Sequence, residues 1–371
     1  MNIQSCKTPF RHLLKTPLLL AAAAGMLLVI SSCATQTPVK VVEEETPELV
    51  WPNPPEQAII RYVGFVRNVE DIDIKERPGF ADLLAGKDTK ESASTLNKPF
   101  GVHGDNQGRL FVTDTALGAL IVFDRETDKV GRWGETGMGK LSKPIGVTSD
   151  KSGRVYVCDV VDRRVVVFDS EGNYVTAFGG KEIFESPVAI AVNDDLKRIY
   201  VLDSKQHQLI IFDMQGKHLF SVGQKGGRPG DFMFPTGIAI GSDGRLFISD
   251  TMNFRVQILD SDGGYLKSFG QIGQNVGNFN RPKGIALDSD GHIYVVDASF
   301  GNFQIFDEDG QLLLYIGQNG QAPGEFLLPT GIHIDQKNNV YVADQINHRV
   351  QIFEYLGKPQ PVETEVENPG Q

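Results

Sequence analysis

The sequence predicts an all-β fold, a six-bladed β-propeller, because one strand pattern recurs six times. Each copy opens with Pro-x-Gly, or Pro-x-Ala in the third, and closes its second strand signal with aspartate. The third motif positions are Gly101, Gly146, Ala189, Gly237, Gly284 and Gly331, and the aspartates are Asp114, Asp159, Asp203, Asp250, Asp297 and Asp344. Successive motifs lie 43 to 48 residues apart. This repeat length, built from β-branched and aromatic runs, is typical of propeller blades, since solenoid repeats of similar period are mostly helical.

Residues 1–32 have the composition of an export signal. Three basic residues precede an uncharged apolar run, residues 17–30, which is shorter than the roughly 20 residues that a membrane-spanning helix needs. The run ends at Ile30-Ser-Ser-Cys33, which resembles a bacterial lipobox, so Cys33 is expected to be acylated and to become the N-terminus. Ala34 then indicates the outer membrane, by resemblance to lipoprotein sorting in Gram-negative bacteria. An ordinary secretory signal that contains a cysteine is the alternative.

Residues 33–56 are rich in Thr, Val, Glu and Pro and are predicted to form a lipidated, extended tether. Cys158 would be the remaining thiol after processing, so no internal disulfide is expected. The formal net charge of −11 becomes −14 when residues 1–32, with three basic residues and no acid, are removed. Because such a surface repels phosphate backbones, no nucleic-acid partner is expected. The acidic segment 358–371 is expected to be disordered.

Residues 57–357 are predicted to form the propeller. Its repeats lie near 97–140, 141–184, 185–232, 233–279, 280–326 and 327–357. The first five copies have a fourth strand that ends at glycine, whereas the sixth has none. We expect the strand signal at 59–66 to complete the last blade, which would leave no open edge between blades six and one. The intervening stretch, 67–98, is expected to be a crossover loop with a short amphipathic helix at 80–84, or else a functional lid.

Within each copy, Asp-x-x-Gly-Arg-Ile-Tyr-Val-x-Asp and x-x-Asn-x-Arg-Val-Gln-Ile-Phe follow the opening motif, and this pattern resembles the NHL repeat over about 300 residues. Arg164, Arg255 and Arg349 occupy the arginine position, while Ala119, Gln208 and Asn302 replace it in the other copies. We expect the aspartate to accept backbone N–H groups and to meet this arginine across the turn between the second and third strands.

One position of the first strand is expected to face the channel. It is occupied by His103, Thr148, Ala191, Ala239, Ala286 and His333, so the two histidines lie on neighbouring blades. Peptidyl-hydroxyglycine lyases, which resemble NHL propellers, bind zinc with three channel histidines. With only two here, the histidines are expected to bond the channel wall or water, and a zinc site is the alternative. The Asp-rich turns lack the spaced ligands of a twelve-residue calcium loop. No cofactor is therefore expected, although zinc or calcium stays open.

The sequence is consistent with two functions. The first is a lipid-anchored scaffold of the bacterial cell envelope that binds a protein or peptide with the face carrying the second-to-third turns. The residues expected on that face are Arg164, His207, Asn253, Arg255, Asn347, His348 and Arg349, with His207 and His348 exposed to solvent. The second is a metal-dependent lyase or lactonase that uses the channel histidines. No nucleophile elbow, Walker loop or dinucleotide fingerprint is present.

Overall fold

The computed structural model describes residues 48–68, 71 and 95–357. The predicted signal peptide, Cys33, the tether up to residue 47, the helix at 80–84 and the acidic tail lie outside these residues. In the described part, the elements are β-strands and one 3₁₀ turn, Thr251–Asn253. No described helix has the length and apolar character to cross a bilayer.

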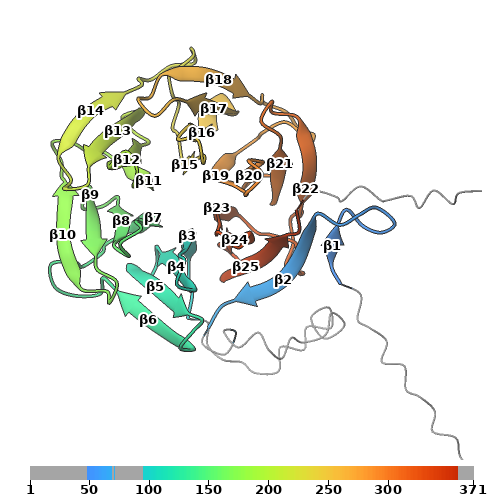
Figure 1. The fold of residues 1–371 in the computed structure, drawn as a ribbon, viewed down its shortest axis with the longest axis horizontal. Helices are drawn as coiled ribbons and strands as arrows, with labels where there is room; N and C mark the ends of the chain where they lie inside the picture. Colours follow the sequence, from blue (N-terminus) through green and yellow to red (C-terminus); the bar gives the residue numbers. More distant parts are fainter. Residues whose placement is uncertain (1–47, 69–70, 72–94, 358–371) are drawn as a thin grey trace, which may run out of the picture. The chain divides into compact units, whose positions relative to one another are not determined.

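Six antiparallel sheets form a ring around a central axis, as predicted (Figure 1). Blade one comprises β3 (Pro99–Gly104), β4 (Arg109–Asp114), β5 (Ala119–Asp124) and β6 (Lys129–Trp133). Blade two comprises β7 (Pro144–Ser149), β8 (Val155–Asp159), β9 (Arg164–Phe168) and β10 (Tyr174–Gly179). Blade three comprises β11 (Pro187–Asn193), β12 (Arg198–Asp203), β13 (Gln208–Asp213) and β14 (His218–Val222).

Blade four comprises β15 (Gly237–Ile240), β16 (Leu246–Asp250), β17 (Arg255–Leu259) and β18 (Tyr265–Phe269). Blade five comprises β19 (Pro282–Leu287), β20 (Ile293–Asp297), β21 (Asn302–Phe306) and β22 (Leu312–Ile316). Blade six comprises β23 (Pro329–Ile334), β24 (Asn339–Asp344), β25 (Arg349–Tyr355), β2 (Ile60–Val66) and β1 (Val50–Trp51). The first strand of each blade lies innermost (Figure 1).

The last blade is closed by the N-terminal strand, as predicted. β2 pairs antiparallel with β25, from Ile60 opposite Tyr355 to Val66 opposite Val350. Ile60 belongs to the hydrophobic cluster between blades five and six, and Val66 to the cluster between blades six and one. A single strand therefore contributes to the cores on both sides of the closing blade.

The propeller begins earlier than the predicted boundary at residue 57. β1 pairs with β2 on its outer side, with Val50 opposite Arg61 and Trp51 opposite Ile60. The Trp51 ring also contacts Phe353, at a centroid distance of 5.8 Å. The end of the predicted tether is thus a fifth strand of blade six, because pairing covers part of the exposed edge of β2.

Close backbone approach around the axis explains the glycine of the Pro-x-Gly motif. A Cβ atom on Gly284 would lie 2.7 Å from both Thr330 O and Ile332 N of the next blade. A Cβ atom on Gly146 would lie 2.9 Å from the Cα atom of Ala189. Real Cβ atoms do not approach backbone so closely, so the motif marks where adjacent first strands meet. The third blade, with Ala189, accommodates a methyl group at this position.

The core is divided among the six junctions between blades. Each of six hydrophobic clusters draws residues from two neighbouring sheets. The second and third strands are buried on both faces, which explains their continuous apolar runs. Cys158 lies inside the junction of blades two and three, where burial raises the pKa of its thiol and leaves it unreactive.

Candidate functional site

The antiparallel order gives the propeller two chemically different faces. One face carries the second-to-third turns together with the connections between blades, and we call it the turn face. Its turns are residues 115–118, 160–163, 204–207, 251–254, 298–301 and 345–348. The opposite face carries the hairpins between strands one and two and between strands three and four, and we call it the hairpin face.

The aspartate that ends each second strand is buried and ties the blade to the connection that precedes it. Asp114 Oδ2 accepts the backbone N–H groups of Asn97 at 2.6 Å and Lys98 at 2.8 Å, and its Oδ1 accepts two N–H groups of the following turn. In the remaining blades the equivalent carboxylate accepts backbone N–H from its own connection. These aspartates are therefore structural.

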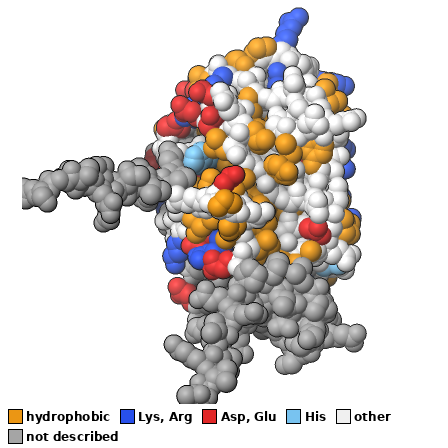
Figure 2. Space-filling view, turned by 90° about the vertical axis from the view of Figure 1, so that its right-hand side faces the viewer, with side chains coloured by type: hydrophobic (Ala, Val, Ile, Leu, Met, Phe, Trp, Pro, Cys, Tyr) orange, Lys and Arg blue, Asp and Glu red, His pale blue; other side chains and the backbone are white. Residues whose placement is uncertain are grey.

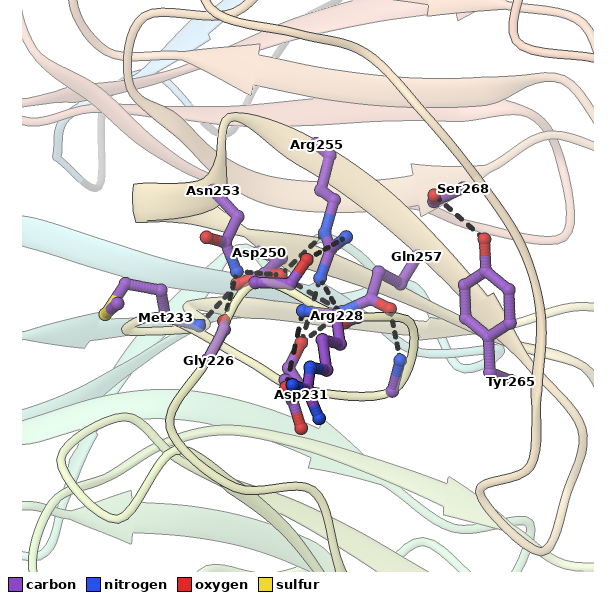
Figure 3. A network of polar contacts seen from close by, with 12 residues as sticks. Gly226, Arg228, Asp231, Met233, Asp250, Asn253, Arg255, Gln257, Tyr265 and Ser268 are labelled. Carbon is purple, nitrogen blue, oxygen red and sulfur yellow. Dashed lines mark hydrogen bonds and ion pairs between the residues drawn. The ribbon is translucent and has the colours of Figure 1, made fainter.

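Blade four extends this contact into a network (Figure 3). Asp250 Oδ2 accepts Arg255 Nε at 2.9 Å, Asn253 Nδ2 at 2.8 Å and Gln257 Nε2 at 3.0 Å. The other nitrogens of Arg255 donate to the carbonyls of Gly227, Arg228 and Asp231 in the preceding connection. Most of the donors of this arginine are thereby used within the protein.

Blade six repeats the network around Asp344. Arg349 Nε, Asn347 Nδ2 and Gln351 Nε2 all donate to Asp344 Oδ2, at 2.8, 2.8 and 3.1 Å. Burial raises the pKa of the Asp344 carboxyl, and Arg349 beside it acts in the opposite direction. Four of the seven residues expected to contact a partner, the Asn and Arg pairs of blades four and six, thus stabilise turns.

The other three residues of that set lie in different surroundings. Arg164 donates to the carbonyls of Met138 and Lys140, at 3.2 and 2.7 Å, and its ion-pair partner is Asp162 rather than the buried aspartate. His348 is exposed and its Nδ1–H donates to the carbonyl of Asn97, so it joins blade six to the start of blade one.

The expectation of a solvent-exposed His207 is wrong. This side chain is buried, its Nδ1 accepts the N–H of Phe234 at 3.0 Å, and its ring packs edge-on against the Phe234 ring. Burial lowers its pKa, helped by Lys225. The sequence could not reveal this, because the covering residue belongs to the connection to the next blade.

Exposed apolar side chains on the turn face were missed by sequence reasoning. The second residue after the buried aspartate is Val161 in blade two, Met252 in blade four and Ile346 in blade six, with 58, 51 and 48% of their surface exposed. Leu117 and Met138 are exposed on the same face. The sequence contained a signal for these residues, because large apolar residues at every second copy of a turn position depart from the usual polar turn.

The outer wall also carries exposed apolar side chains. Figure 2 shows the side on which β22 lies, and hydrophobic side chains gather there. Leu313 and Tyr315 of β22 are about as exposed as Ile346. Because period-two strands at a sheet edge commonly present some apolar side chains, this wall is the less distinctive surface.

The two channel histidines meet across the closing junction. The rings of His103 and His333 are 4.3 Å apart between centroids. His103 Nε2 accepts the N–H of Ser149 at 3.2 Å and lies 2.8 Å from Ser149 Oγ, whereas His333 Nε2 donates to Gly104 O at 3.0 Å. In the neutral state, His103 therefore carries its proton on Nδ1 and His333 on Nε2.

Both imidazoles are neutral at physiological pH. Burial lowers the pKa of His333 to about 4. Burial also holds the pKa of His103 well below its usual value, and the proximity of His333 acts in the same direction, since two protonated rings would repel each other. Each Nε2 atom already has a protein partner, and the described residues contain no group of three or more His, Cys, Asp or Glu placed to hold a metal. A zinc site at this pair stays a prediction.

The channel contains a small cavity of about 80 Å³ toward the turn face. Three consecutive residues from the start of each first strand line it, including Phe100, Ile145, Val188, Thr236, Lys283 and Thr330 at the middle positions of the Pro-x-Gly motifs. Lys283 is the one charged residue in this lining. Its place in the Pro-x-Gly motif could be read from the sequence, whereas the residues that surround it could not.

A larger cavity, of about 430 Å³, opens between blades four and five on the hairpin face. Its charged groups are paired with one another or with neighbours. Arg245 pairs with Asp243, His292 Nδ1 lies 2.8 Å from Asp288 Oδ2, and Tyr355 donates to Asp290 at 2.6 Å. The lining still has a net negative charge, because its four carboxylates, Asp243, Asp290, Asp307 and Glu308, face one arginine, Arg245.

Two family models match parts of the chain. One is described as a 6-bladed beta-propeller and matches residues 184–252 and 287–358, and the other, an SMP-30/Gluconolactonase/LRE-like region, matches residues 228–322. The fold is that of a six-bladed β-propeller. The NHL type of its repeats is not tested by these matches. No curated protein sequence matches the chain.

Solved structures share the propeller fold at low sequence identity. A Bacteroides thetaiotaomicron protein of unknown function has a TM-score of 0.56 at 18% identity, over 71% of this chain and 70% of its own. An inactive virginiamycin B lyase from Staphylococcus aureus with quinupristin has 0.53 at 13%, over 71% and 83%. A gluconolactonase from Xanthomonas campestris has 0.53 at 18%, over 70% and 87%. At such identity the likeness shows the fold alone.

Proposed function

We propose that this propeller is a binding scaffold of the bacterial cell envelope that recruits a protein or peptide through its turn face. The observation that carries the proposal is the recurrence of Val161, Met252 and Ile346 at one turn position in alternate blades, each about half exposed. Together with Leu117 and Met138, these side chains place apolar surface on one face of the propeller, and exposed apolar surface of this kind is what a protein or peptide partner covers.

The neighbouring Asn and Arg side chains support this surface from below. Because Arg255 and Arg349 hold the turn and the preceding connection together, the apolar side chains project from backbone that is fixed before binding. A preorganised surface loses less conformational entropy when a partner binds. The partner therefore contacts mainly the apolar residues, and the predicted polar set positions them.

Membrane attachment and location rest on the N-terminal sequence. The proposal is that Cys33 is acylated and holds the propeller at the outer membrane, with contact to the membrane only through the lipid. With Cys33→Ala, the protein is expected to leave the membrane fraction or to accumulate as an uncleaved precursor. A Cys33→Ala protein that is processed and membrane-bound like the natural chain would contradict the anchor.

The alternative is a metal-dependent lyase or lactonase. The match of residues 228–322 to an SMP-30/Gluconolactonase/LRE-like model favours it. The histidine pair weakens it, because both Nε2 atoms are already used and a catalytic zinc commonly has three protein ligands. Stoichiometric zinc that disappears in a His103→Ala, His333→Ala protein would replace the scaffold proposal with this one.

The scaffold is tested by capture of cross-linked partners from envelopes. Changing Val161, Met252 and Ile346 together to serine is expected to reduce recovery of the partner by about tenfold, which corresponds to 1.4 kcal/mol. The matched control changes Val175, Leu219 and Leu313, which are similarly exposed on the outer strands, and is expected to keep recovery unchanged. Equal recovery from both variants would refute binding by the turn face.

A further inference from the structure

The cavity at the turn-face end of the channel combines one cation with an apolar wall. Lys283 enters it from blade five, while Phe100, Ile145 and Val188 line it from blades one to three. The two threonines of the lining use their hydroxyls within the protein, since Thr330 donates to Phe100 O at 2.8 Å and Thr236 bonds the Thr251 hydroxyl at 2.6 Å. Among the described residues, the Lys283 amine is therefore the side-chain donor of this lining that has no protein partner.

The basic side chains at this end of the channel have no counter-charge among the described residues. Within the described part of the chain, neither Lys283 nor the side chain of Arg281, two residues before it, has an ion pair or a side-chain hydrogen bond. Burial, together with the charge of Arg281, lowers the pKa of Lys283 to about 8. A partly dehydrated ammonium without a counter-charge is unfavourable unless an anion completes the site.

The number of donors and the size of the cavity limit the anion. A phosphate presents more oxygens than one amine and an outlying guanidinium can satisfy in this apolar lining. About 80 Å³ is roughly the share of two or three liquid water molecules. A single carboxylate group on a short apolar stem matches both limits, with its charge at Lys283 and its stem against the opposite wall.

We propose that the turn-face end of the axial channel is a binding site for an apolar carboxylate, with Lys283 as its charge partner. The carboxylate belongs to a small organic acid or to the C-terminus of a peptide with an apolar last residue, which share this chemistry. The site does not depend on partner binding by the turns, because its residues lie inside the channel.

The test titrates the full chain with acetate, propanoate and butanoate, with butanamide as the neutral control. Affinity is expected to rise roughly fourfold per methylene until the cavity is filled, and butanamide is expected not to bind. Lys283→Met should weaken butanoate binding at least about tenfold, whereas Lys283→Arg should retain binding. Lys140→Met, which removes an exposed lysine elsewhere on the turn face, is the matched control and should bind as the natural chain does.

Two further measurements use the natural chain, so they test the site even if a Lys283 variant fails to fold. Binding should fall as pH rises through about 8, because the amine loses its charge, and butanoate should raise the pKa of the Lys283 amine measured by NMR after reductive methylation with ¹³C. Equal binding of butanoate and butanamide, or an unchanged amine pKa at saturating butanoate, would overturn the site. A free-acid tripeptide ending in valine that binds more tightly than butanoate assigns the ligand to peptide C-termini, and the reverse order assigns it to small acids.

Discussion

Ring closure by the N-terminal strand predicts that a single residue far from the other blades in sequence controls the stability of the whole propeller. Ile60 is fully buried, with 0% of its surface exposed, in a cluster with Phe353, Tyr355 and residues of blade five. Ile60→Ala leaves a cavity between two blades and should lower the free energy of unfolding by about 3 kcal/mol, within the range for buried Ile-to-Ala changes. The control is Ile272→Ala, at an exposed connection residue (65%), where a change below about 0.5 kcal/mol is expected.

The assay follows urea unfolding by tryptophan fluorescence. The chain contains two tryptophans, Trp51 in β1 and Trp133 in β6 of blade one, so variants that keep one of them report separately on the closing strands and on the next blade. For a slope near 3 kcal/mol/M, a loss of about 3 kcal/mol lowers the midpoint by about 1 M urea. Both tryptophans should give the same midpoint if closure and ring are one cooperative unit.

Two results would refute this reasoning. If Ile60→Ala is as stable as Ile272→Ala, β2 does not contribute to the core as the burial of Ile60 implies. If Trp51 reports unfolding at clearly lower urea than Trp133 in the natural chain, the closing strands separate while the ring persists, and the N-terminal strand is an accessory edge.

Gly284→Ala should destabilise the protein by about 1–3 kcal/mol, because its methyl group would meet backbone of blade six. Gly227→Ala should be nearly neutral, because its Cβ atom would make only an ordinary van der Waals contact, 3.7 Å from Asn253 Oδ1. Chemical denaturation of both variants measures the difference, and equal effects would contradict the steric origin of the motif glycine. Protonation of His333 is opposed in the folded state, where its pKa is about 4 against 6.5 in the unfolded chain, so its contribution is complete above pH 6.5 and is lost as pH falls toward 4. Stability should drop by about 2 kcal/mol between pH 7 and pH 5 through this group, and the drop should be smaller in His333→Gln; an unchanged pH profile in that variant would show that the ring is not held neutral by its surroundings.

The position of the channel histidines depends on the same ring closure that stabilises the propeller. His103 and His333 approach each other only because blade six closes on blade one. The hydrogen bond from His333 to Gly104 crosses that junction, whereas the contact of His103 with Ser149 joins blade one to blade two. A substitution that loosens closure should therefore also change the channel. This coupling gives a reason to measure ligand binding and stability on the same variants.

The sequence by itself determined the fold, because the features that define a blade are local and repeated. Pro-x-Gly and the buried aspartate recur at fixed spacing, and each has a structural role in its own blade or at the adjacent junction. The sixth repeat lacks a fourth strand, so counting the strands of each repeat predicted that a segment from elsewhere in the chain completes the last blade, as β2 does. The Asp–Arg contact was predicted for the same reason in blades four and six, where the partners are five residues apart.

Only the tertiary structure decided what surrounds each candidate functional group. His207 is covered by Phe234 of a neighbouring connection, β1 is too short to show periodicity, and Arg164 turns from its aspartate to carbonyls of the preceding connection. Lys283 became a candidate because six first strands converge and leave its amine without a counter-charge in the described part of the chain. Burial, pairing and pKa depend on residues that are distant in sequence, and a repeated local pattern carries no information about which of them meet.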